Sequence, residues 1–309
     1  MSANFTGNAS VPEVLTIGWF RFPIDIDMNY EVIVILHHVL VVLSLLTNPI
    51  LLYVIIKTLN NSTGKNSGLL LAIICLTNIF VTGFGFIKIT IGSVINDDIM
   101  ARVMSISLPM YYLATFLLAL NNYGLIVIPL KFKTLSPKPK TLVGILVLVW
   151  VTVTLVLVVA PSFGNFDNTV ILTAVVAFCW SATIIIAIMY AKILLTLYRR
   201  KVTLRRTLNV SGSRQGMVVM KQNTKLAKVL LFYILVLIVL TLPLYTSVML
   251  EIRCSQCDKH ALVMFSGYTL PAAMTMPVIH VFHWLLLTPL YYKEVKRLVM
   301  KVFFCWKKH

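Results

Sequence analysis

The stretch ALNNYGLIVIPLKFKTL, residues 119–135, decides the fold of this chain. It begins apolar, reaches a proline at Pro129 and ends with two lysines. A helix that leaves a lipid bilayer on the cytoplasmic side has this order, because proline breaks the helix and the cationic end stays in water. The adjacent amides of Asn121 and Asn122 need hydrogen-bonding partners inside such a helix. The stretch therefore predicts a membrane-spanning helix with a polar, basic cytoplasmic end.

The composition of the whole chain supports a membrane protein. It has 309 residues, of which 59% are hydrophobic and 12% charged, and a mean hydropathy of +0.91. Soluble domains carry about 25% charged residues. Seven apolar segments are each long enough to cross a hydrocarbon core of roughly 30 Å: residues 30–57, 67–95, 100–132, 141–161, 169–198, 225–250 and 262–290. We therefore expect an all-α membrane protein, a seven-transmembrane helix bundle.

The charged residues divide between the two sides of these seven segments. With the first end outside, 22 of the 27 basic residues fall on the cytoplasmic side together with 1 of the 10 acidic residues. This asymmetry follows the positive-inside rule and predicts an extracellular N-terminus and a cytoplasmic C-terminus. The net charge of +17 would also suit a nucleic-acid-binding protein, but a groove for nucleic acid would not divide the charges in this way.

The sequence predicts three covalent modifications. Sequons at Asn4 and Asn8 predict N-glycosylation of the external N-terminal segment. Cys254 and Cys257 form C-S-Q-C in a predicted external loop. A disulfide fits this pair better than a zinc site, because two further zinc ligands are missing. Cys305, near the cytoplasmic end of the chain, is a candidate for palmitoylation.

The expected organisation has three parts: an extracellular segment at 1–29, the seven-transmembrane bundle at 30–291, and an amphipathic eighth helix with a cytoplasmic tail at 292–309. In the last part, apolar residues recur at the spacing of one helix face: Val295, Leu298, Val299, Val302 and Phe303. Lysines and an arginine lie beside this stripe. The pattern is typical of a helix that lies on the surface of anionic lipid.

Three motifs resemble those of rhodopsin-like (class A) G-protein-coupled receptors. N-N-Y-G-L-I-V-I-P-L, residues 121–130, has the spacing of the D-R-Y-x-x-x-x-x-P-L signature of the third helix. Pro243 matches the proline of the sixth-helix C-W-x-P motif, and T-P-L-Y-Y at 288–292 is close to the seventh-helix N-P-x-x-Y. Within the family, P-L-K-F after the third helix and K-E-V-K after P-L-Y-Y look most like vertebrate odorant receptors. The resemblance covers all seven helices and the eighth.

The chain departs from the family at charged and cysteine positions. Asn121 and Asn122 are neutral where the family has an aspartate and an arginine, and Asn78 replaces the second-helix aspartate that usually holds sodium. Asp97 stands near the place of the cysteine that the family bonds to its second external loop. The resemblance therefore implies a receptor without that disulfide and without the usual sodium site.

The resemblance implies a plasma-membrane receptor that binds an extracellular small molecule, such as an odorant or another chemosensory cue, within the bundle. It would signal to a heterotrimeric G protein, contact membrane lipids, need no cofactor and catalyse no reaction. The motif offsets imply a ligand pocket that includes Met104, Ser105, Leu108, Phe178, Tyr245 and Phe282. They imply that the coupling switch includes Asn121, Asn122, Tyr123, Tyr190, Pro243, Pro289 and Tyr292.

Lys88 is a further ligand-binding candidate, because it lies in the apolar run F-G-F-I-K-I-T-I-G of the second helix. A lysine inside a membrane helix is usually paired or faces a wet cavity. It either extends towards the external surface, where acidic residues are within reach, or contacts an acidic group of the ligand.

Two other classes of protein stay open. The first is an intramembrane zinc hydrolase in which His37, His38, His280 and His283 bind the metal. It lacks a carboxylate base, since no Asp or Glu lies in the middle of an apolar segment. The second is a divergent decoy receptor, in which the two asparagines reflect the loss of efficient coupling. A transporter is disfavoured, because the two halves of the chain show no internal symmetry.

Overall fold

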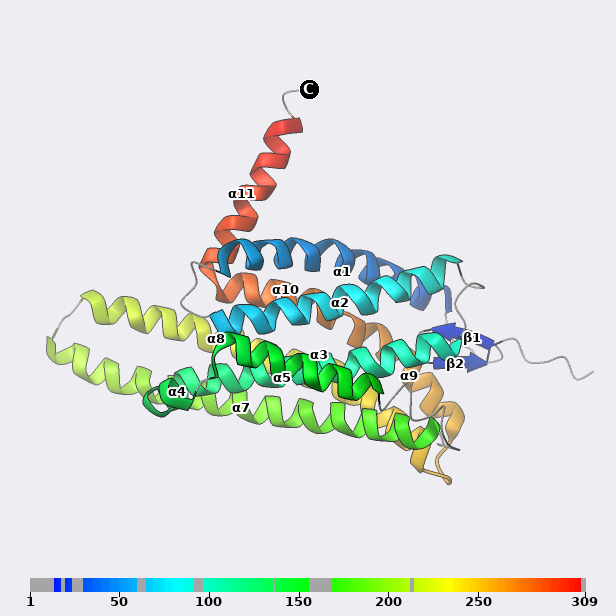
Figure 1. Ribbon diagram of the computed structural model, residues 1–309. Helices are drawn as coiled ribbons and strands as arrows, with labels where there is room; N and C mark the ends of the chain where they lie inside the picture. Colours follow the sequence, from blue (N-terminus) through cyan, green and yellow to red (C-terminus); the bar gives the residue numbers. More distant parts are fainter. Residues whose placement is uncertain are drawn as a thin grey trace, which may run out of the picture.

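The structure is a computed structural model, and it describes residues 14–17, 20–23, 30–59, 65–91, 97–135, 137–155, 168–211 and 214–306. Within these ranges the description leaves out some side chains, among them those at 88–91, 97–105, 204–211, 214–224 and 302–306. The described helices are α1 Tyr30–Thr58, α2 Lys65–Ile91, α3 Asp97–Val127, α4 Pro129–Leu135, α5 Pro139–Thr154, α7 Asn168–Ser211, α8 Arg214–Arg253, α9 Lys259–Met274, α10 Met276–Leu287 and α11 Pro289–Trp306. The long helices run side by side as one bundle, and α11 leaves the bundle at one end (Figure 1).

Six helical stretches are long and apolar enough to cross a membrane: Ile35–Thr58, Lys65–Phe84, Ile106–Val127, Thr173–Thr203, Lys225–Arg253 and His260–Leu287. The last stretch combines α9 and α10. α5 is apolar too, but its 16 residues are fewer than a full crossing needs. The predicted class, a helical protein that crosses the membrane several times, is confirmed in this coarse form.

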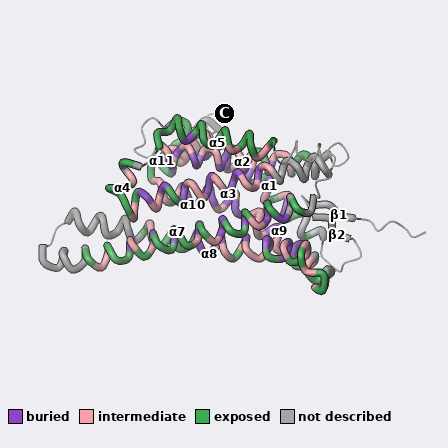
Figure 2. The backbone as a smooth tube through the Cα atoms, turned by 60° about the horizontal axis from the view of Figure 1, so that its bottom comes forward, coloured by how far each residue is buried: buried purple, intermediate pink, exposed green. Residues whose placement is uncertain are grey.

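The surface of the bundle suits lipid. Helix α5, for example, exposes Val147, Leu148 and Trp150 and buries Leu142 and Leu146. Along the long helices, buried positions alternate with exposed ones, so that each helix has an inner and an outer face (Figure 2). The apolar side chains on the outer faces indicate a lipid environment, because exposing an apolar surface of this extent to water is unfavourable.

Helix α3 lies at the centre of the packing. It contacts α2 on one side and α7 on the other, and α1 packs on α2 while α8 packs on α7 and α9. The core residues of α3 include Tyr111, Tyr112, Ala114, Leu118 and Ala119. Small alanines at two of these positions let the neighbouring helices approach closely.

The N-terminal segment departs from the all-α prediction. Strands β1 Val14–Ile17 and β2 Phe20–Pro23 form an antiparallel hairpin, with Val14 opposite Pro23 and Ile17 opposite Phe20. Strand β2 contacts α9 at the end of the bundle opposite α11 (Figure 1). Valine, isoleucine and phenylalanine favour strands, and two residues between such runs are the shortest hairpin connection. The two predicted glycosylation sites, Asn4 and Asn8, lie outside the described residues.

The last helix begins three positions before the predicted boundary at residue 292. Helix α10 ends at Leu287, Thr288 is extended with φ −112° and ψ 95°, and α11 begins at Pro289. The residue before a proline is pushed out of the helical region, and proline itself is well tolerated at the first position of a helix. The T-P-L-Y-Y motif therefore starts the last helix instead of ending the seventh.

The segment 199–224 is also more regular than its basic, polar sequence predicts. We expect a flexible connector there, but α7 continues to Ser211 and α8 begins at Arg214. Both helices extend past the rest of the bundle on the same side (Figure 1). The stretch from 199 to 211 has no glycine or proline and contains good helix formers, so nothing local interrupts the helix.

Candidate functional site

A cavity of about 120 Å³ lies inside the bundle, between α2, α3, α7, α8, α9 and α10. Its wall is mainly aliphatic and includes Val81, Val176, Leu244, Val248 and Met274. The α8 residues that line it belong to the last third of that helix, so the cavity lies towards the end of the bundle where α8 passes into α9. By its position between six helices it is the best candidate for a ligand site in the described part of the chain.

Two of the predicted pocket residues, Leu108 and Tyr245, line this cavity. The side chains of three others, Lys88, Met104 and Ser105, lie outside the described residues.

The placement predicted for Phe178 and Phe282 needs correction, because both side chains are on the outer surface, 42% and 55% exposed. On α7 the buried neighbours of Phe178 are Val176 and Cys179, and on α10 His283 is buried next to Phe282. One residue along a helix turns the side chain by about 100°. A motif offset therefore does not fix which face of its helix a residue occupies.

Polar residues that the sequence interpretation did not select also line the cavity: Asn78, Tyr111, Tyr112 and Thr241. Asn78 Nδ2 donates to Asn48 Oδ1 at 3.0 Å, and Thr241 Oγ1 donates to the Leu237 carbonyl at 2.6 Å. The ring of Tyr112 meets the ring of Tyr245 edge to face, with centroids 5.7 Å apart. The sequence could have indicated these residues, because Tyr111 and Tyr112 are adjacent in the middle of an apolar helix and a buried phenol usually needs a hydrogen-bond partner.

A cluster of aromatic and histidine side chains adjoins the cavity through Tyr111. Trp284 Nε1 donates to His280 Nε2 at 2.9 Å. Since this ring nitrogen accepts, the hydrogen of the neutral imidazole is on Nδ1, which faces the Tyr233 hydroxyl at 3.3 Å. The contact joins α10 to α8 inside the core.

Part of the same cluster has no hydrogen-bonding partner. The ring of His283 packs on the ring of Tyr233 with centroids 4.3 Å apart. Neither ring nitrogen of His283, nor the Tyr111 hydroxyl, has a hydrogen-bond partner within 3.5 Å among the described residues. Buried polar groups are normally paired, so this cluster is an exception that calls for an explanation.

The structure does not bring the histidines of the hydrolase hypothesis together as a metal centre. Within the described part of the chain, no three His, Cys, Asp or Glu side chains converge. His37 is buried on α1, whereas His280 and His283 belong to the cluster around Tyr233. Zinc needs three or four converging ligands, so this arrangement gives the hydrolase hypothesis no support.

The paired asparagines of α3 have different partners. Asn121 Nδ2 donates to Ser67 Oγ on α2 at 2.6 Å, and the Asn122 side chain lies near the hydroxyl of Tyr190 on α7. Both amides thus face polar groups of neighbouring helices, as expected in a membrane interior.

Gly124, one turn further on, has a steric role. A Cβ atom at Gly124 would overlap the ring of Phe132, because α4 folds back against the end of α3. The glycine therefore allows the P-L-K-F segment to pack there.

Ring contacts connect the cavity to Asn122. Successive ring centroids are 5.3 to 6.2 Å apart along the series Tyr245, Tyr112, Tyr111, His280, Tyr233 and Tyr190. The last ring carries the hydroxyl that lies near Asn122. We refer to these six residues as the aromatic series; they come from α3, α7, α8 and α10.

The other predicted switch residues have mixed placements. Tyr292 is 55% exposed, whereas the preceding Tyr291 is only 6% exposed and its hydroxyl lies near Gly68. The buried tyrosine of this motif is therefore Tyr291, because the helix restarts at Pro289 and changes its phase. Pro243 lies within α8, and Tyr123 packs partly buried against the core.

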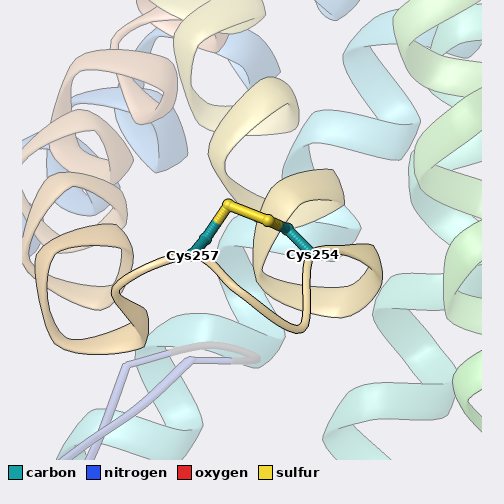
Figure 3. Close-up of a disulfide and its surroundings, with 2 residues drawn as sticks. All are labelled: Cys254 and Cys257. Carbon is teal, nitrogen blue, oxygen red and sulfur yellow. A yellow bond between two sulfur atoms is a disulfide. The ribbon is translucent and has the colours of Figure 1, made fainter.

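A disulfide between Cys254 and Cys257 closes the loop between α8 and α9 (Figure 3). Asp258 then caps α9, since its side chain accepts from the backbone N–H groups of His260 at 2.9 Å and Ala261 at 3.2 Å. The loop is thus held at both ends, next to the cavity end of the bundle. The side chain of Cys305 lies outside the described residues.

Comparison of the sequence with known protein families and with curated proteins finds no match to this chain.

Proposed function

We propose that this chain is a rhodopsin-like G-protein-coupled receptor of the plasma membrane, which binds a small extracellular molecule such as an odorant or another chemosensory cue. The ligand occupies the cavity between α3 and α8, and a heterotrimeric G protein binds at the opposite end of the bundle. The observation that carries the proposal is the aromatic series, because it connects the cavity to the Asn122 region, where the family motif lies.

The proposal assigns seven membrane crossings, with the predicted segment 141–161, whose described part belongs to α5, as the fourth and α9 with α10 as the seventh. The strongly basic ends of α7 and α8 then lie in the cytoplasm, as the positive-inside rule requires. Helix α11 is the eighth helix and lies on the inner lipid surface. Glycosylation at Asn4 or Asn8 and palmitoylation at Cys305 agree with this orientation.

The mechanism is a shift between two arrangements of the bundle. Ligand contact with Tyr245 and Tyr112 favours one position of α8 relative to α3. Tyr233 precedes Tyr245 on the same helix and contacts His280 and Tyr190. A movement of α8 therefore alters these contacts. The contact between Tyr190 and Asn122 then changes at the end where the G protein binds. Lys88 would add a contact only for a ligand with an acidic group.

Coupling is expected to be weaker than in a typical member of the family. An arginine offers five donors and a fixed positive charge, whereas Asn122 is short and neutral. It lies near the Tyr190 hydroxyl, and Asn121 donates to Ser67. Asn121, Asn122 and Tyr190 therefore form a neutral switch in this proposal.

Restoring the family residues tests the proposal. The double variant Asn121→Asp with Asn122→Arg should raise agonist-driven nucleotide exchange of a purified G protein, at unchanged surface expression. The single variant Tyr190→Phe is the matched control, since it removes only the hydroxyl that meets Asn122. If wild type and both variants show no agonist-dependent exchange with any G-protein class, the decoy receptor is the better description.

The orientation can be tested separately. Tags at the two ends of the chain should be accessible from outside at the first residue and from inside at the last. Sugar should be found on Asn4 or Asn8 only. Sugar on Asn61 or Asn209, which also fit the sequon pattern, would reverse the proposed orientation.

A further inference from the structure

The wall of the cavity carries no ionised group. Of the 15 residues that line it, none is Asp, Glu, Lys, Arg or His. An ionic ligand group placed there would lose its hydration and meet no opposite charge. Among the lining residues that the structure describes, nothing could compensate an ammonium or a carboxylate.

Two polar groups of the wall are engaged within the protein, since Asn78 donates to Asn48 and Thr241 donates to a backbone carbonyl. The Tyr111 hydroxyl has no partner within 3.5 Å among the described residues. A ligand therefore meets only uncharged donors and acceptors in the described wall. Its binding has to come from burial of apolar surface and from contact with the tyrosine rings.

The size of the cavity indicates how large a ligand group it can hold. An apolar cavity of roughly 150 Å³ holds one benzene molecule, and the volume here is about 120 Å³. The rings of Tyr111 and Tyr112 are edge to face at 5.3 Å, and those of Tyr112 and Tyr245 at 5.7 Å. A further ring in the cavity can extend the same arrangement.

We propose that the cavity selects an uncharged, mainly apolar molecule of about the size of one aromatic ring. This inference rests on the proposed function, in which this cavity is the ligand site. It excludes the two ionic ligand classes, amines and carboxylates, from this cavity. The side chain of Lys88 lies outside the described residues, and an anion held by that lysine is the outcome that would contradict this ligand class.

The test uses four probes of one shape: toluene, benzyl alcohol, benzylamine, which is cationic at neutral pH, and benzoate, which is anionic. Binding to the purified full chain in lipid nanodiscs is measured by ligand-observed NMR and by the shift in thermal unfolding. Toluene and benzyl alcohol should bind, and the two ionic probes should bind at least tenfold more weakly. Equal binding of either ionic probe and benzyl alcohol would overturn the inference.

Three variants distinguish binding in the cavity from partitioning of the probes into the surrounding lipid. Ala273→Leu fills part of the cavity and should weaken benzyl alcohol binding at least tenfold. Phe282→Leu changes an exposed aromatic residue on the lipid-facing side of the next helix and should leave binding unchanged. Leu108→Ala enlarges the cavity and should shift the preference towards a two-ring molecule such as naphthalene. Unchanged binding in both cavity variants would overturn the inference, since the probes would then only partition into lipid.

The test distinguishes failure of the ligand class from failure of the proposed function, because binding is measured without a G protein. If the neutral probes bind as expected but never change nucleotide exchange, the receptor function fails and the ligand class stands. If an anion drives exchange and Lys88→Met lowers its potency at least tenfold, the ligand class fails and the receptor function stands.

Discussion

Two buried polar clusters in this bundle differ in how completely they are paired. Between α1 and α2, Asn48 Nδ2 donates to the carbonyl and to the hydroxyl of Ser44, both at 3.0 Å, and Asn48 Oδ1 accepts from Asn78. We refer to these three residues as the amide network. Around Tyr233, between α3, α8 and α10, His280 is paired, but His283 and the Tyr111 hydroxyl have no partner within 3.5 Å among the described residues.

The difference separates a fixed part of the molecule from an adaptable one. A fully satisfied polar network holds its helices in one arrangement, because any movement would leave a buried donor unpaired. A partly satisfied cluster loses less on moving, because a new arrangement can pair groups that were unpaired before. We therefore expect α1 and α2 to act as a frame, and α8 and α10 to move relative to α3.

The largest loss of unfolding free energy is expected from breaking the amide network. Asn48→Leu removes the acceptor of Asn78 and leaves buried polar groups unpaired. It should lower the free energy of unfolding by about 2 to 3 kcal/mol, within the cost of an unsatisfied buried group. Thermal unfolding of the purified protein in detergent measures this. Adding Asn78→Leu should recover part of the loss, because both partners are then apolar; a larger loss in the double variant would contradict the network.

The cluster around Tyr233 should respond unequally to removal of two hydroxyl groups. Tyr233→Phe removes the partner of His280 Nδ1 and should cost about 1 to 2 kcal/mol. Tyr111→Phe removes a hydroxyl without a near partner and should be neutral or slightly stabilising. The two changes have the same chemistry, so each is the control for the other. Equal losses of unfolding free energy would mean that the Tyr111 hydroxyl is paired in solution.

The third substitution should have a smaller effect on the free energy of unfolding, and of the opposite sign. His283→Phe keeps the ring contact with Tyr233 and removes two buried nitrogens without partners. We expect it to raise the free energy of unfolding by up to about 1 kcal/mol. If the cluster is the adaptable part, the same variant should reduce the response to ligand. A destabilised variant with an unchanged response would contradict this assignment.

The sequence predicted the membrane class better than it predicted which face each side chain occupies. Leu108 and Tyr245 line the cavity, but Phe178 and Phe282, carried over by the same offsets, face outwards. Depth follows from the number of residues along a helix. The face depends on how each helix is rotated against its neighbours, and a shift of one residue changes it by about 100°.

Other differences have the same origin in tertiary contacts. Tyr291 replaces Tyr292 as the buried tyrosine because the chain leaves the helix at Thr288 and restarts at Pro289. The pairing of Asn78 with Asn48 joins residues 30 positions apart, and no local pattern specifies it. The Cys254–Cys257 disulfide, by contrast, spans only three positions, so the local sequence was sufficient to predict it.

The smallest effect should come from the exposed ion pair that joins α11 to α1. Lys57 Nζ lies 2.6 Å from Glu294 Oε2, and Arg297 approaches the same carboxylate at 3.8 Å. The hydrogen bond from Lys57 holds the pKa of Glu294 below its ordinary value, and the charges of Lys57 and Arg297 act in the same direction. Unlike the amide network, this pair is in contact with solvent, so screening makes its contribution small.

The sign of the pH dependence follows from this lowered pKa. The ionised Glu294 stabilises the folded chain above the unfolded-state pKa of about 4.3, and this contribution is lost as the pH falls through the lower folded-state pKa. Glu294→Gln should therefore lower the unfolding temperature slightly at about pH 7 and have no effect at about pH 2. High salt should reduce the difference at neutral pH. Lys57→Met is the matched variant, and the double variant should lose no more than either single one. A Glu294→Gln effect that persists unchanged at acidic pH would show that the side chain packs there without acting through its charge.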